Sequence, residues 1–122
     1  MNCNKADIAG EIVTIPRRMH SEDKSPFTLL KETGYFELHD QVVVSDIREA
    51  LTRFPECVKE WMQHSEDKRT SGWYIIQNEE GRYEVGSVAE NGERSNQISL
   101  DSRFDACATF IKREIEDIRS GK

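Results

Sequence analysis

The chain lacks an excess of basic residues, a long apolar run and any familiar nucleotide-binding or hydrolase motif. Of its 122 residues, 23 are acidic and 17 are basic, so the net charge is −6. Nonspecific nucleic-acid binding needs a basic surface that displaces counterions, and this composition argues against it. No apolar stretch approaches the ~18 residues of a membrane-spanning helix, and residues 1–10 lack the hydrophobic centre of a signal peptide. These absences favour a cytoplasmic protein.

Cysteine is also scarce, and its number is odd: Cys3, Cys57 and Cys107. An odd number does not fit a disulfide framework, and the last two fall on apolar stripes of predicted helices. We therefore expect buried free thiols in a reducing compartment. The other candidate metal ligands are three scattered histidines: His20, His39 and His64. None lies at the short spacing typical of metal ligands, so we expect no metal and no cofactor.

No set of catalytic residues stands out. Gly-x-Ser-x-Gly, P-loop and Gly-x-Gly-x-x-Gly motifs are absent. Carboxylates are plentiful, but nothing in the sequence places two of them together for general acid–base catalysis. We expect a protein that is not an enzyme. A small hydrolase that uses Cys57 or a histidine is the weaker alternative.

Residues 72–100 predict a three-stranded antiparallel meander. Asn91-Gly92 is typical of a two-residue type I′ turn between the second and third strands. That turn sets four pairs: Glu90 with Glu93, Ser87 with Asn96, Val85 with Ile98 and Tyr83 with Leu100. One face then carries the apolar members of these pairs, and the other carries four polar or small residues: Glu84, Gly86, Gln97 and Ser99.

The turn at residues 78–81 leaves two registers open for the first strand. A turn closed by a bulge at Gly81 places Trp73 and Ile75 on the core face, whereas a plain four-residue loop places Tyr74 and Ile76 there. We favour the bulge because glycine adopts the left-handed conformation that it needs. In either register, one aromatic residue of the Trp73-Tyr74 pair lies on the polar face. It either anchors a partner or is buried under the N-terminal helices.

An amphipathic helix is predicted from about residue 102 to 119, and it covers the apolar face of the sheet. Its stripe has three-four spacing: Phe104, Cys107, Ala108, Ile111, Ile115 and Ile118. Asp101 or Ser102 caps its start and Gly121 follows its end. The whole chain, 1–122, is thus predicted to be one α+β domain with helices before the sheet.

The N-terminal half is harder to interpret. Residues 1–24 are expected to be a mobile segment with a short helix or an edge strand at 8–15. Ser25-Pro26 starts a helix, residues 35–44 are β-prone, and Ser45-Asp46 caps a further helix that Pro55 either kinks or divides. The pentapeptide His-Ser-Glu-Asp-Lys occurs twice, at 20–24 and 64–68, in flanks that do not match.

Acidic residues crowd the two predicted hairpins: Glu79, Glu80, Glu84, Glu90 and Glu93. Such a run is usually a solvated surface, but it can also steer a cationic partner. We therefore assign the candidate partner-binding site to these five glutamates as a charged rim, with Trp73 or Tyr74 as the anchor.

Several segments together resemble a bacterial immunity protein of the contact-dependent growth inhibition or wider polymorphic-toxin type. They are Ser25-Pro26-Phe27 with Leu29-Leu30, the helical stretch Ser45 to Trp61, Ser71-Gly-Trp-Tyr74, Tyr83-Glu-Val-Gly86 and Asp105-Ala-Cys-Ala-x-Phe-Ile-x-x-Glu-Ile115. The resemblance implies a small cytoplasmic protein that binds and neutralises the C-terminal domain of a cognate toxin, commonly a nuclease with a basic cleft. It implies no catalytic residue.

The alternative hypothesis is a small cytosolic regulatory or adaptor protein. It would bind another protein, or a second copy of itself, through an exposed sheet edge at Gly72–Gln77 or Asn96–Leu100.

Overall fold

The structure is a computed structural model, and it describes residues 5–67 and 72–121. Its helices are α1 Lys5–Val13, α2 Ile15–Glu22, α3 Pro26–Glu32, α4 Tyr35–Leu38, α5 Val44–Arg53, α6 Glu56–Asp67 and α7 Arg103–Ser120. Its strands are β1 Gly72–Gln77, β2 Tyr83–Val88 and β3 Arg94–Leu100, which form one antiparallel sheet in the order β1-β2-β3. The predicted α+β class is confirmed. No helix in the described ranges is long and apolar enough to cross a membrane.

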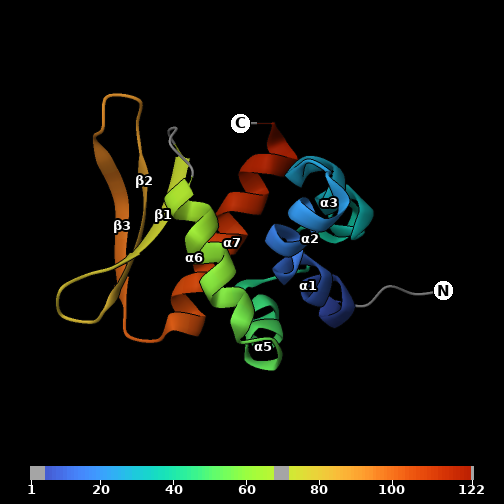
Figure 1. The fold of residues 1–122 in the computed structure, drawn as a ribbon, viewed down its shortest axis with the longest axis horizontal. Coiled ribbons are helices and arrows are strands. Elements are labelled where there is room, and N and C mark those ends of the chain that lie inside the picture. Colours follow the sequence, from blue (N-terminus) through green and yellow to red (C-terminus); the bar gives the residue numbers. More distant parts are fainter. Residues whose placement is uncertain (1–4, 68–71, 122) are drawn as a thin grey trace.

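Helix α7 lies between the sheet and the N-terminal helices α1–α3, while α6 also packs against β1 (Figure 1). Helix α7 packs against all three strands on one side and against α3, α5 and α6 on the other. The predicted apolar stripe is confirmed, because each of its six residues is buried in the core or packs against it. Three further residues of α7 are also buried: Ala106, Phe110 and Glu114. The helix ends as predicted, with Ser102 as N-cap and Gly121 in the left-handed conformation at its C-terminus.

Residues 5–22 form two helices, where the sequence indicated a mobile segment with one short helix or an edge strand. Ile8 and Ile12 of α1 are fully buried, and Ile15 at the start of α2 is 1% exposed. Pro16 lies in the first turn of α2, where a backbone N–H has no acceptor within the helix, so proline costs no helical hydrogen bond there. The N-terminal segment therefore contributes to the main core.

The segment from Tyr35 to Val44 contains no strand, which corrects the prediction of β-prone runs there. Residues Tyr35–Leu38 form the short helix α4, and α5 already begins at Val44. Asp46 caps α5 from its third position, since its carboxylate accepts a hydrogen bond of 2.9 Å from the Val43 N–H. The helix therefore begins before the predicted cap at Ser45-Asp46: Val43 is the N-cap, and Asp46 lies in the first turn. Pro55 separates α5 from α6, as one of the two alternatives required.

The first hairpin has the favoured register. Ile75 pairs with Val85, and the loop closes with Gly81 at φ 83° after an Asn78 N–H to Arg82 C=O bond of 2.8 Å. Both partners of the Ile75–Val85 pair are buried. The bulge therefore places Trp73 and Ile75 toward the helices, as predicted.

The second hairpin is only partly as predicted. The Tyr83–Leu100 and Val85–Ile98 pairs are confirmed, but Ser87 pairs with Ser95 instead of Asn96. The turn is a three-residue loop closed by Ala89 and Glu93, so the predicted Glu90–Glu93 pair is also wrong. This loop shifts the pairs beside it by one residue from the predicted register. A bulge at Asn96, which adopts a positive φ of 55°, adds one residue to β3 and returns the later pairs to the predicted register.

Trp61 links the N-terminal helices to the central layer. Its indole N–H donates a 3.0 Å hydrogen bond to the Val13 carbonyl, and its ring packs edge-on against Phe110 of α7 at 6.2 Å between centroids. The side chain is 1% exposed. One residue of α6 thus contacts both α1 and α7.

Replacing Trp61 with Phe should lower the free energy of unfolding by about 1–3 kcal/mol. The variant leaves the buried Val13 carbonyl without its donor and creates a small cavity. Urea denaturation followed by circular dichroism measures the change. Lys59→Ala, an exposed position on the same helix, should change stability by less than about 0.5 kcal/mol. Equal effects of the two variants would show that Trp61 does not link the layers.

Candidate interaction surface

The solvent-facing side of the sheet is closed in its middle by Tyr74. Its ring lies across β2 at Gly86, where an added Cβ would lie 2.8 Å from the tyrosine oxygen. Only glycine leaves room for the ring there. Tyr74 is consequently 9% exposed although it lies on the polar face. The sequence predicted that one aromatic residue would face this way, and Tyr74 does so. It is covered by the sheet itself and not by the N-terminal helices.

Polar groups surround the Tyr74 hydroxyl. It donates a hydrogen bond to Glu84, and Gln97 donates to both of them, at 3.4 Å and 3.2 Å. The Arg94 guanidinium lies 5.0 Å above the tyrosine ring centroid and 3.6 Å from the Glu84 carboxylate. Burial, followed by the bond to Glu84, raises the pKa of Tyr74. The hydrogen bonds from Tyr74 and Gln97 lower the pKa of Glu84, against a smaller effect of burial.

Trp73 points the other way. The Arg113 guanidinium of α7 stacks on its ring at 4.7 Å and reaches on to the Asn96 carbonyl at 3.4 Å. Trp73 therefore packs between the sheet and α7, and it is not available as an anchor on the polar face.

The five candidate glutamates do not form one patch. The β1–β2 turn carries Glu79 and Glu80, and the β2–β3 turn with its flank carries Glu90 and Glu93; the two turns lie at opposite ends of the sheet (Figure 1). Glu84 lies between them and is held by Tyr74, Gln97 and Arg94. We call the two pairs the acidic tips. Six residues of β2 span about 20 Å, so with their loops the tips are on the order of 30 Å apart.

The acidic tips have no counter-charge within the described part of the chain. The two arginines of the sheet pair elsewhere: Arg82 with Asp101 at 2.9 Å, and Arg94 with Glu84. Neutralisation of the middle and exposure of the tips together concentrate negative charge at the two ends of this surface.

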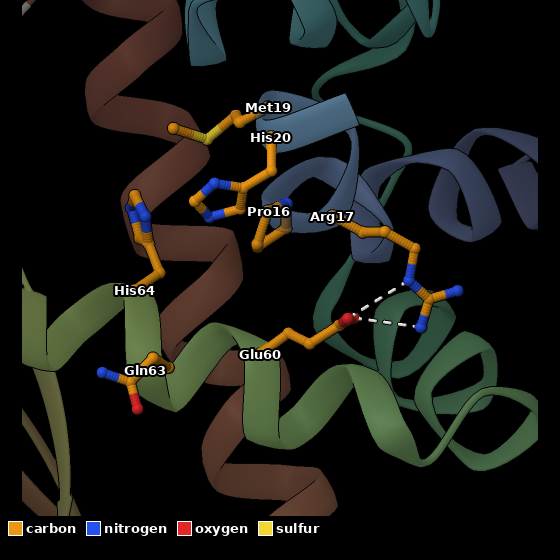
Figure 2. Close-up of a pocket in the computed structure, with 7 residues that line it drawn as sticks. All are labelled: Pro16, Arg17, Met19, His20, Glu60, Gln63 and His64. Carbon is orange, nitrogen blue, oxygen red and sulfur yellow. Dashed lines mark hydrogen bonds and ion pairs between the residues drawn. The ribbon is translucent and has the colours of Figure 1, made fainter. Parts of the chain in front are cut away.

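A pocket of about 320 Å³ lies between α2 and α6, and sequence reasoning missed it (Figure 2). Seven residues line it: Pro16, Arg17, Met19, His20, Glu60, Gln63 and His64. Arg17 and Glu60 close one end with hydrogen bonds of 3.1 Å and 3.2 Å. The only sequence signal was the repeated pentapeptide, whose two histidines both reach this pocket from the ends of α2 and α6.

The surface that lines the pocket is mainly apolar. His64 lies 3.8 Å from the buried Glu114 carboxylate and packs edge-on against Trp61. Arg17 and Glu60 neutralise each other. In the described ranges no group of three or more His, Cys, Asp or Glu side chains has the arrangement of a metal site.

A second polar cluster joins α7 to α4. Tyr35 donates to Glu116, Lys112 donates to the Tyr35 hydroxyl and the His39 carbonyl at 2.7 Å each, and Arg119 forms two 3.1 Å bonds with Glu116. Burial lowers the pKa of Lys112 and raises that of Tyr35. Burial also opposes ionisation of Glu116, but the bonds from Arg119 and Tyr35 outweigh it and lower its pKa. These groups satisfy one another, so the cluster fastens the helices together.

Cys57 and Cys107 are buried and free, as predicted, and Cys3 lies outside the described residues. Burial raises the pKa of Cys57 to about 11 and that of Cys107 further. A thiol with so high a pKa is a poor nucleophile at neutral pH.

Comparisons with protein-family models, curated proteins and solved structures gave no significant match. Inferences about function therefore depend on the chain's own geometry.

Replacing Gly86 with Ala should displace the Tyr74 ring and lower stability by about 1–3 kcal/mol, because the added methyl overlaps the ring. Tyr74→Ala in the Gly86→Ala background should then cost less than Tyr74→Ala alone, which a double-mutant cycle in urea measures. Additive effects would contradict the contact.

Tyr74→Phe should destabilise the protein at neutral pH but not in acid. The pKa of Glu84 is lowered in the folded state, so its stabilising effect is complete above its ordinary value of 4.5 and is lost as the pH falls through the folded value. The variant removes the largest cause of this shift. The difference from the wild type in urea unfolding should shrink below about pH 4.5; a difference that does not depend on pH would contradict the linkage.

Proposed function

We propose that this protein is an immunity protein that binds a cognate toxin domain in the cytoplasm and neutralises it by stoichiometric contact, without turnover. The proposal joins the resemblance in the sequence to one structural observation. That observation is the pair of acidic tips, which have no counter-charge in the described residues and flank the solvent-facing side of the sheet.

The spacing of the tips suits a protein partner. A standard interface covers about 800 Å² on each side, which corresponds to a disc about 30 Å across. The acidic tips are separated by a similar length, so one partner of ordinary interface size could contact both. A small ligand could not. Carboxylates at the rim of such a surface speed association with a basic partner, and a basic cleft is what a nuclease presents to phosphate.

The exposed carboxylates also explain how a nuclease would be blocked. Side-chain carboxylates placed over a phosphate-binding cleft satisfy its arginines and lysines and exclude the anionic substrate. A nuclease is therefore the toxin class that we propose, and the interaction requires no catalytic group in this chain.

The first test is co-expression with the protein encoded next to this chain. If that neighbour, or its C-terminal domain, arrests growth and this protein restores it through a complex that co-purifies at one-to-one stoichiometry, the proposal is supported. A harmless neighbour, or rescue without a complex, would overturn it.

Charge reversal then tests the tips. We expect Glu79→Lys/Glu80→Lys and Glu90→Lys/Glu93→Lys each to slow association by about tenfold at low salt, with less effect at high salt, as for steered encounters. Stopped-flow fluorescence or surface plasmon resonance with the purified toxin domain measures the rate constants.

The matched control is Glu37→Lys/Glu49→Lys. It makes the same change in net charge at two exposed helical positions away from the sheet. If the control slows association as much as the tip variants, the effect comes from net charge and the tips have no special role. If no variant changes the rate, the charged rim is wrong.

A further inference from the structure

The two edges of the sheet differ in their exposure. The β1 edge is covered by α6, whose Ser65 hydroxyl accepts a 3.0 Å hydrogen bond from the Ile75 N–H. In β3, the other edge strand, Arg94–Ser99 are all exposed, and even Ile98 on the core side is 36% exposed. The sheet is therefore closed at β1 and open at β3.

The hydrogen-bond pattern identifies the backbone groups that face the open edge. The Asn78 N–H donates a hydrogen bond to the Arg82 carbonyl, so these two residues form a hydrogen-bonded pair of the β1–β2 hairpin. By alternation, the even-numbered residues of β2 form the hydrogen bonds to β1. Bonding direction alternates along a strand, so Tyr83 and Val85 bond to Leu100 and Ile98 of β3. Ser99 lies between these two partners. Its N–H and C=O consequently point away from the sheet, toward the position of a fourth strand.

The usual devices that block an open edge are few along β3. It contains no proline or lysine, and Ser95–Ser99 carry no charge. The Arg94 side chain lies on the polar face, where it stacks on the Tyr74 ring and pairs with Glu84. The bulge at Asn96 interrupts the regular hydrogen-bonding pattern of the edge, and the Asn96 carbonyl already accepts a hydrogen bond from Arg113. The regular open stretch is therefore Gln97–Leu100.

Carboxylates stand at both ends of this edge. Glu93 precedes β3 and forms no ion pair within the described residues. Asp101 follows β3 and is 86% exposed, but it pairs with Arg82 at 2.9 Å, so its charge is partly offset. Two copies of the chain paired in parallel along β3 would bring Glu93 against Glu93, and these like charges oppose such pairing. The same carboxylate attracts a strand with a basic end.

We propose that the partner adds an extended segment to the β3 edge, as a fourth strand with an uncharged centre and a lysine or arginine toward the end that meets Glu93. The backbone of Ser99 bonds to this strand, and Glu93 contacts its basic end. This inference rests on the proposed function, because it names how the toxin domain is held. The acidic tips then act in the encounter, and the β3 edge supplies directional contacts.

Ser99→Pro tests the proposal, with Ser99→Ala as the matched control. Proline removes the outward N–H and places its ring where the fourth strand would lie. It takes no hydrogen bond from the existing sheet, and prolines are tolerated on edge strands for this reason. Alanine removes the same hydroxyl but keeps the N–H. With the purified toxin domain, we expect Ser99→Pro to weaken binding on the order of tenfold or more, mainly through faster dissociation, and Ser99→Ala to bind like the wild type.

Hydrogen exchange of the wild-type complex is the second measurement, and it does not depend on any variant folding. Amides of residues 97–100 that exchange quickly in the free protein should become protected in the complex. Unchanged exchange there, with protection at α2 and α6 instead, would overturn the inference while leaving the proposed function intact.

Three other results would overturn the inference, the proposed function or both. A toxin domain that binds Ser99→Pro as tightly as the wild type would overturn strand addition alone. A wild-type protein that forms no complex would overturn the proposed function and this inference together. A concentration-dependent dimer in sedimentation that Ser99→Pro converts to monomer would overturn the inference by assigning the edge to a second copy of the chain.

Discussion

The fold depends on the burial of α7 along most of its surface. A three-stranded sheet cannot bury enough apolar area to be stable alone, and an amphipathic helix in a protein gains most of its stability by packing its apolar face. Each needs the other. Small residues such as Ala106 and Ala108 let neighbouring elements approach the helix closely, while Phe110 fills the space toward Trp61. The helical layer and the sheet are therefore joined mainly through α7, which contacts all three strands, while α6 adds a contact with β1 alone.

The polar face of the sheet shows how a local steric feature shapes the charge of a surface. Gly86 leaves room for the Tyr74 ring, and the ring brings its hydroxyl to Glu84. That bond holds Glu84 beside Arg94 and Gln97, so its charge is neutralised within the face. The remaining carboxylates of the described hairpins lie at the turns, where no cation reaches them. A surface that is acidic in sequence is thus neutral in its middle and negative at both ends.

Much of the fold could be predicted because it follows from periodicity. The stripe of α7 and the alternation along the strands repeat with the period of a helix or a strand. The register of the first hairpin followed from Gly81, and the Tyr83–Leu100 and Val85–Ile98 pairs hold because the bulge at Asn96 offsets the different second turn. The second turn could not be predicted reliably, since Asn91-Gly92 suits both a two-residue turn and the three-residue loop that forms. The compensating bulge at Asn96 has no clear sequence signature at all.

The candidate site was harder to predict, for a different reason. Glu80 and Glu90 are near in sequence, but a strand separates them by its whole length, so sequence proximity exaggerated their clustering. The pocket between α2 and α6 depends on contacts between residues far apart in the chain, such as Arg17 and Glu60. Periodicity within each helix carries no information about that contact.

An open sheet edge has to accept a partner strand and also has to avoid pairing with another copy of the same protein. An edge without proline or lysine is a template for any strand, including that of another copy of the same protein. Here the Glu93 carboxylate opposes parallel self-pairing without altering the backbone groups of the edge. A blocking proline would have prevented aggregation as well, but it would also have removed the donor that a partner needs. Selectivity by charge keeps the edge usable, and it makes the sign of the partner's charge the property that decides which strand can bind.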